Sequence, residues 1–142
     1  MNLPLDYPNC FVCGADNSRG LRLSFSYDQE TRLVESRFSL HEDFNGWPGV
    51  AHGGIVASIL DETAYYAIAQ HGQQWAGGLT VNINLDYKAP TPLCQPLLAQ
   101  AWVEKSRRNL VYCQTRLYRE KDMKLLAQAV VSYLMKKTSA TI

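Results

Sequence analysis

The sequence predicts an α+β fold in which an antiparallel sheet packs against one long helix, in the order β-β-α-β-β-β-β. Residues 55–69 form an apolar segment of helical length whose only charged residues are Asp61 and Glu62. Residues 79–88 form the most regular of the strand-like segments, and they alternate apolar and polar residues with the period of two that a half-buried strand requires. Short polar turns separate most of these segments, which favours hairpins and therefore an antiparallel sheet.

Two strands and a loop are expected before the helix. Residues 21–27 alternate apolar and polar side chains, residues 28–30 suit a turn, and residues 31–39 suit a second strand. Residues 41–49 contain two glycines, a proline and an asparagine, so they predict a loop that leads to the helix.

The helix itself has apolar residues on every side of a helical wheel, which predicts a helix that is buried all round. At about 1.5 Å per residue it spans roughly 22 Å, too short to cross a membrane. His71 and Gly72 suit its C-terminal end. Asp61 and Glu62 point about 100° apart, so the two acids need not share a role. Asp61 lies on a more apolar face of the helix than Glu62, so Asp61 is the better candidate for a buried functional carboxylate.

Four strands are expected after the helix. Residues 79–88 alternate without interruption and are followed by two prolines, which cannot donate to a ladder. Residues 97–105, 109–118 and 124–135 predict three more strands. The last segment also contains good helix formers, but its β-branched centre and its position in a hairpin favour a strand.

The whole chain of 142 residues is expected to form a single domain, 1–142. A net charge of +1 with 19% charged residues argues against a nucleic-acid binder. No apolar run follows a basic N-terminus and no segment is long enough to span a bilayer, so neither a signal peptide nor a membrane span is expected. These features predict a cytoplasmic protein with reduced thiols.

The four cysteines are candidate metal ligands. Residues 1–19 predict an irregular N-terminal arm that contains Cys10-x-x-Cys13, which is half of a zinc site. Cys94 and Cys113 form no second tight pair, the three histidines are scattered, and a structural zinc ion needs four ligands. We therefore expect no metal, and two thiols in a loop that closes over the core.

A buried carboxylate is costly unless it is paired, hydrogen-bonded or functional. One interpretation is that Asp61 and Glu62 reach solvent or cap a neighbouring loop. The other is that one of them does chemistry, and the residues alone leave open which of the two it is.

One pattern resembles a known family. His52-Gly53-Gly54, followed after six residues by Asp61, resembles the hotdog-fold acyl-CoA thioesterases, in the branch of the phenylacetate-pathway enzymes and the mammalian thioesterase-superfamily members. The strand Thr80–Tyr87 followed by Ala89-Pro90 resembles the strand after the helix in that family, and the Cys-x-x-Cys-Gly element also recurs in it.

The resemblance implies a five- or six-stranded antiparallel sheet wrapped around the helix, in homodimers that often pair into homotetramers. It implies active sites at the dimer interface with residues from both chains. Asp61 matches the family's acid, the nucleophile or general base. The N–H groups around Gly53 and Gly54 match the element that polarises the thioester carbonyl, and His52 matches the histidine that orients this loop or the thioester.

Two further polar residues match the family's site. Thr80 matches a position that helps to place the attacking water or the other subunit's acid. Asn45 resembles a polar residue upstream of His52, although six residues separate them where one fewer is expected.

The chemistry agrees with the residues. Thioester hydrolysis needs an activated water or carboxylate and stabilisation of an oxyanion, and a helix N-terminus offers unpaired N–H donors. Asp61 lies two turns, roughly 11 Å, from that entrance, which fits a site shared by two chains.

The expected substrate is an acyl-CoA, and no separate cofactor is expected because coenzyme A enters with the substrate. Candidates for its phosphates are Lys88, Lys105, Arg107 and Arg108; candidates for the acyl pocket are Phe44, Trp47 and Tyr65. Two alternatives stay open: a hotdog dehydratase that acts on hydroxyacyl thioesters, and a non-catalytic dimer that binds acyl-CoA.

Overall fold

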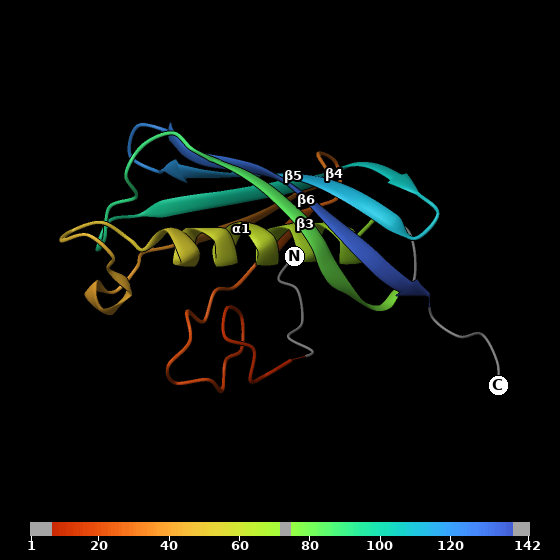
Figure 1. The fold of residues 1–142 in the computed structure, drawn as a ribbon, viewed down its shortest axis with the longest axis horizontal. Helices are drawn as coiled ribbons and strands as arrows, with labels where there is room; N and C mark the ends of the chain where they lie inside the picture. Colours follow the sequence, from red (N-terminus) through yellow and green to blue (C-terminus); the bar gives the residue numbers. More distant parts are fainter. Residues whose placement is uncertain (1–6, 72–74, 138–142) are drawn as a thin grey trace.

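The computed structural model describes residues 7–71 and 75–137, and it has one long helix against a six-stranded antiparallel sheet. The strand order is β1-β2-β4-β5-β6-β3. The elements are β1 (Ser26–Asp28), β2 (Leu33–Phe38), the short 3₁₀ helix η1 (Glu42–Phe44), α1 (Gly53–Ala69), β3 (Trp75–Tyr87), β4 (Leu97–Arg107), β5 (Leu110–Arg119) and β6 (Lys124–Lys137). The sheet curves over one side of α1, and the N-terminal segment passes on the other side (Figure 1). The predicted α+β architecture is confirmed.

α1 begins two residues before the expected segment, because His52 caps it. The Nδ1 atom of His52 accepts a hydrogen bond from the Gly54 N–H at 2.9 Å. The side of α1 that meets the sheet is fully buried and includes Ile59, Leu60 and Ile68. No helix in the described part of the chain combines the length and the apolarity of a membrane span.

Burial on every side of α1 was expected, and this is wrong for one stripe of the helix. Gly54 is exposed, and Ser58, Asp61, Glu62 and Tyr65 are only partly buried. These residues recur at the spacing of one helix face. The sheet buries the opposite face and meets this stripe through Thr80 and Tyr133, so the stripe stays partly accessible and can form a site.

The predicted strand over residues 21–27 is mostly wrong, since β1 begins only at Ser26. Arg22 has a φ of 54°, which interrupts an extended backbone. The N–H groups of Leu21 and Leu23 donate to the carbonyls of Phe11 and Val12 at 2.9 Å each, so this segment pairs with the N-terminal arm. The alternation does reflect burial on one side of this segment, because Leu23 is buried in the core.

The strands after the helix are confirmed, with shifted ends. β3 begins at Trp75, four residues earlier than predicted, and β6 is a strand throughout rather than a helix. β4 and β5 lie within two residues of the predicted bounds.

β3 contains a β-bulge that its regular sequence alternation does not reveal. Thr80 pairs with Tyr133 and Asn82 with Ser132, so Val81 is an extra residue without a partner on β6. The inserted residue reverses the face to which the later side chains point, relative to the residues before it. Thr80 before the bulge and Tyr87 beyond it therefore both face α1. The Tyr87 hydroxyl donates to the Gly53 carbonyl at 2.6 Å.

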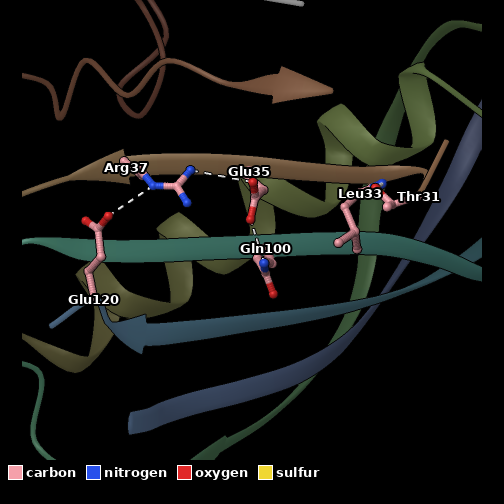
Figure 2. A network of polar contacts seen from close by, with 6 residues as sticks. All are labelled: Thr31, Leu33, Glu35, Arg37, Gln100 and Glu120. Atoms are coloured by element: carbon pink, nitrogen blue, oxygen red, sulfur yellow. Dashed lines mark hydrogen bonds and ion pairs between the residues drawn. The ribbon is translucent and has the colours of Figure 1, made fainter. Parts of the chain in front are cut away.

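The face of the sheet away from α1 is polar on β2 and β4. Arg37 donates to Glu120 at 3.0 Å and lies 3.5 Å from Glu35, which accepts a hydrogen bond from Gln100 at 2.6 Å. Figure 2 shows this network on the strands, with α1 behind them. The intervening residue Ser36 is buried on the helix side. The apolar core therefore lies on the helix side alone.

The thiols are expected to differ in reactivity by burial. Cys113 is fully buried, its thiol lies 3.6 Å from the Ala64 carbonyl oxygen, and burial raises its pKa to about 12. Cys94 is exposed. Because the thiolate is the nucleophile, alkylation at about pH 8 should modify Cys94 quickly, and Cys113 only after unfolding or as the pH approaches its raised pKa. Peptide mass spectrometry over an iodoacetamide time course measures both rates. Equal rates in the native protein would contradict this assignment.

Candidate active site

Two hollows lie along the partly exposed stripe of α1. The first is at the N-terminus of the helix, and its lining includes Phe11, Phe44, Asn45, His52, Gly54 and Ser58. The second is near the middle of the helix, and its lining includes Tyr7, Asp61, Glu62, Tyr65, Thr80 and Tyr133. Most of the residues predicted to form the site therefore fall in one of these two places.

The loop before α1 holds the helix entrance in position. The His52 N–H donates to the Phe44 carbonyl at 3.0 Å, and Asn45 forms a bridge with Ala51. Gly46 packs directly on His52, where an added Cβ would lie 3.0 Å from the His52 Cα. A side chain at position 46 would therefore push against the residue that caps the helix.

The two glycines at the entrance differ in what they can donate. The Gly54 N–H is occupied by the His52 ring, as described above. Among the residues that the structure describes, the Gly53 N–H has no hydrogen-bond acceptor, and it lies at the positive end of the helix dipole. Of the two predicted donors, Gly53 is therefore the one available to a ligand oxygen.

Asp61 is held by two hydroxyl groups from the sheet. The Thr80 hydroxyl donates to its carboxylate at 2.9 and 3.2 Å, and the Tyr133 hydroxyl donates at 2.6 Å. Burial and the neighbouring Asp61 carboxylate raise the pKa of the Tyr133 phenol, so this group stays a proton donor. These two donors fix the orientation of the carboxylate.

Glu62 faces a different environment from its neighbour. Its carboxylate lies 3.1 Å from the Cys13 sulfur and 3.7 Å from the Cys10 sulfur, beneath the N-terminal arm. Burial raises the pKa of Glu62, and the Asp61 charge adds to this effect. The angle between adjacent helix positions thus gives the two acids separate partners.

The aromatic candidates are distributed unevenly. Phe44 lies at the helix entrance, and Tyr65 lies in the second hollow with its ring centre 5.8 Å from that of Tyr133. Trp47 lies in the loop before α1 with 79% of its surface exposed. In a single chain, Trp47 does not line either hollow.

The basic candidates lie at opposite ends of the molecule. Lys88 lines a hollow beside Gly53, at the N-terminal end of α1. Lys105, Arg107 and Arg108 lie at the β4–β5 turn, where the neighbouring Asn109 bonds the end of β6. This turn lies toward the other end of α1 (Figure 1). A single chain therefore separates three of the four cations from the Gly53 N–H.

Sequence reasoning missed Tyr133, Tyr87 and Tyr7. Tyr133 is directly opposite Thr80 in the β3–β6 register, and a pair opposite one another shares a face of the sheet. A tyrosine on the inward face of a predicted strand was a usable signal. The register that brings Tyr133 to Asp61 was not visible in the sequence.

The comparisons with known proteins point to one family. The model described as the thioesterase superfamily matches residues 48–126, which contain α1, Asp61 and Thr80. Acyl-coenzyme A thioesterase THEM4 of Rattus norvegicus is 27% identical over 122 residues, which are 84% of this chain and 51% of the relative. The chain thus spans about half the length of that relative.

Solved structures share the architecture. A thioesterase superfamily protein has a TM-score of 0.81 at 21% identity, over 89% of this chain and 60% of the other. A protein of Streptococcus mutans that was crystallised bound to acetyl CoA has a TM-score of 0.70 at 15% identity, over 82% of this chain and 91% of the other. At these identities the likeness establishes the fold.

Proposed function

Because the chain belongs to the thioesterase superfamily, we propose that it hydrolyses acyl-coenzyme A thioesters to a free acid and coenzyme A. The observation that carries the proposal is the Asp61 carboxylate, which two hydroxyl groups orient beside a hollow. The name of the Rattus norvegicus relative and the acetyl CoA bound to the Streptococcus mutans protein support this substrate class. The reaction needs no cofactor, since coenzyme A arrives as part of the substrate.

In the proposed mechanism Asp61 is the reacting acid. As a general base it takes a proton from a water molecule, and the oxygen of that water attacks the thioester carbonyl carbon. As a nucleophile it attacks that carbon itself and forms an anhydride, which water then hydrolyses. In both routes the carbon–sulfur bond breaks and the coenzyme A thiolate leaves and takes up a proton. The hydroxyl groups of Thr80 and Tyr133 hold the carboxylate in position.

The Gly53 N–H is the proposed donor to the oxyanion. A backbone donor at a helix N-terminus stabilises negative charge as it develops on the carbonyl oxygen. Gly53 and Asp61 are eight residues apart on one helix, about 12 Å along its axis, which is too far for both to contact the same thioester carbonyl. The proposal therefore requires that Gly53 and Asp61 of one site come from different chains.

A homodimer through β3 would supply that arrangement. β3 lies at one edge of the sheet, pairs only with β6 among the strands that the structure describes, and exposes Leu79, Val81 and Ile83. An exposed apolar edge strand favours pairing with another strand. β3 runs from beyond the C-terminus of α1 back to Gly53, so antiparallel pairing of two β3 strands would bring each helix entrance toward the partner's Asp61.

The same pairing accounts for the distant cations. It would bring the end of the partner that carries Lys105, Arg107 and Arg108 toward the first chain's Gly53, where the phosphates of coenzyme A would need counter-charges. Lys88 would join them from the first chain. We expect such dimers to pair further into tetramers, and we expect a cytoplasmic location.

The proposal is tested by thiol release from acyl-CoAs with short, medium, long and aryl acyl groups. We expect the full chain to release free thiol from at least one class well above background. Binding without release would favour the non-catalytic acyl-CoA dimer. Loss of water from a hydroxyacyl thioester, with the thioester intact, would favour the dehydratase.

Thr80 is expected to act as a positioning residue for Asp61. Thr80→Val should lower kcat/KM by about 10- to 100-fold, because a hydrogen bond to a charged group contributes about 1.5–3 kcal/mol. Thr80→Ser keeps the hydroxyl and should restore most of the activity. Steady-state kinetics of both variants check this. Equal losses in the two variants would show that the hydroxyl alone does not account for the effect, and would contradict the positioning role.

A further inference from the structure

The N-terminal arm brings two thiols and one carboxylate together beside the proposed reaction centre, and Cys10 and Glu62 line the same hollow as Asp61. The ligand atoms of Cys10, Cys13 and Glu62 all lie within 4.8 Å of one another. This is the one group of three or more such side chains found in the described ranges, 7–71 and 75–137. Sequence reasoning looked for cysteine and histidine partners for the Cys-x-x-Cys pair, whereas the third group is an acid on α1, about fifty residues away.

The spacing of these atoms suits a small divalent cation. Zinc binds thiolate sulfur at about 2.3 Å and carboxylate oxygen at about 2.0 Å in a tetrahedron, so sulfur and oxygen ligands of one ion are about 3.5 Å apart. The Cys13 and Cys10 sulfurs lie 3.1 and 3.7 Å from one Glu62 oxygen. Small movements would place an ion between the three atoms.

Hydrogen-bond donors surround the two sulfurs, although burial and the nearby Glu62 raise the pKa of the Cys13 thiol. The N–H groups of Val12 and Cys13 point at the Cys10 sulfur from 3.4 and 3.5 Å, and the Tyr66 hydroxyl bonds the Cys13 sulfur. A thiol sulfur is a weak acceptor, whereas a metal-bound thiolate uses such donors. The turn also depends on Gly14, where a Cβ would overlap the backbone of Cys10 and Pro8. The loop therefore packs closely around the two sulfurs.

We propose that Cys10, Cys13 and Glu62 bind one Zn²⁺ ion and leave its fourth position to a water molecule. The two thiols release their protons to solvent when the ion binds, and Glu62 binds as the carboxylate. Two thiolates select a thiophilic ion such as Zn²⁺ over Mg²⁺ or Ca²⁺. Cys10 and Glu62 are both partly exposed, so solvent can reach the fourth position.

The ion would fix the arm to α1 at the hollow that contains Asp61. Phe11 lies between the two cysteines in sequence and lines the hollow at the helix entrance. Tyr7 precedes them and lines the hollow that contains Asp61. The proposed ion therefore sets two walls of the site without taking part in the reaction, and it gives Glu62 a role distinct from that of Asp61. This inference does not depend on hydrolysis.

The test is the metal content of the full chain, purified without chelator and measured by elemental mass spectrometry. We expect one zinc per chain. After zinc is removed, Co²⁺ should restore occupancy and give a thiolate-to-cobalt charge-transfer band. Cys10→Ser and Glu62→Gln should weaken Co²⁺ binding by at least the roughly 10- to 100-fold that loss of an outer-shell partner costs. Cys94→Ser, an exposed cysteine elsewhere, is the matched control and should bind like the wild type.

Glu62→Gln is the decisive variant, because it leaves both thiols and the side-chain size in place. Circular dichroism checks that each variant is folded. The proposal is overturned if folded wild type binds neither zinc nor Co²⁺ stoichiometrically, if Glu62→Gln binds as tightly as wild type, or if Cys10 and Cys13 are isolated as a disulfide. Hydrolysis is assayed separately, so loss of one proposal leaves the other standing.

Discussion

Replacement of Asp61 by asparagine is expected to lower kcat/KM for acyl-CoA hydrolysis by about 10²- to 10⁴-fold, the range over which a positioned acid or base contributes. The amide has nearly the shape of the carboxylate, and its oxygen can still accept hydrogen bonds from Thr80 and Tyr133. It cannot take a proton from water or attack a thioester. The fold should therefore survive while the chemistry fails, and kinetics beside a thermal melt measure the two separately.

The matched control for this variant is Asp28→Asn. Asp28 is an exposed acid at the end of β1, on the edge of the sheet opposite β3, and the same substitution there should leave kcat/KM within a few-fold of wild type. Glu62→Gln is the opposing test. If it abolished hydrolysis while Asp61→Asn spared it, the assignment of the acid would be wrong.

A double lysine substitution on β3, Leu79→Lys with Val81→Lys, is expected to convert the proposed homodimer to monomers and to reduce hydrolysis by at least about 10²-fold. Both residues are exposed on the edge strand, with 76% and 52% of their surface free in the single chain. Charges on an edge oppose strand pairing. Activity should fall with the dimer, because the Gly53 N–H would lose the partner's Asp61, and removal of one oxyanion donor alone costs about 10²- to 10³-fold.

Light scattering coupled to size-exclusion chromatography gives the mass, and the thiol-release assay gives the activity of the same fractions. Met123→Lys is the matched control, since Met123 is an exposed apolar residue in the β5–β6 turn. A fully active monomer would show that one chain contains a complete site. A variant that stays dimeric would remove β3 as the interface.

The parts of the fold that local sequence determines were predictable. The apolar segment of α1 and the alternation of the later strands identified five of the elements to within a few residues, because burial on one face leaves a periodic trace. Asp61 and Thr80 were both named from the sequence, and the structure brings them within hydrogen-bond distance.

The remainder depended on contacts between distant segments. Residues 21–25 have the alternation of a strand, yet their N–H groups bond the arm, and no local pattern distinguishes these two partners. Glu62 meets two cysteines from the arm, and Tyr133 meets Asp61 across a register set by the whole sheet. The helix was predicted to be buried on all sides because apolar residues beside the stripe, such as Ile55 and Ala57, obscure its polar character.

The bulge at Val81 shifts the alternation of side chains along β3 by one residue. The sequence keeps its alternation through this point, but the extra residue reverses the face of the side chains, so Thr80 before the bulge and Leu85 after it both lie on the helix face. Without the extra residue, the threonine and the apolar half of the strand would lie on opposite faces of the sheet. A single inserted residue thus lets one strand serve both a polar centre and an apolar core. Deletion of Val81 would turn either Thr80 or the apolar residues after the bulge away from the helix.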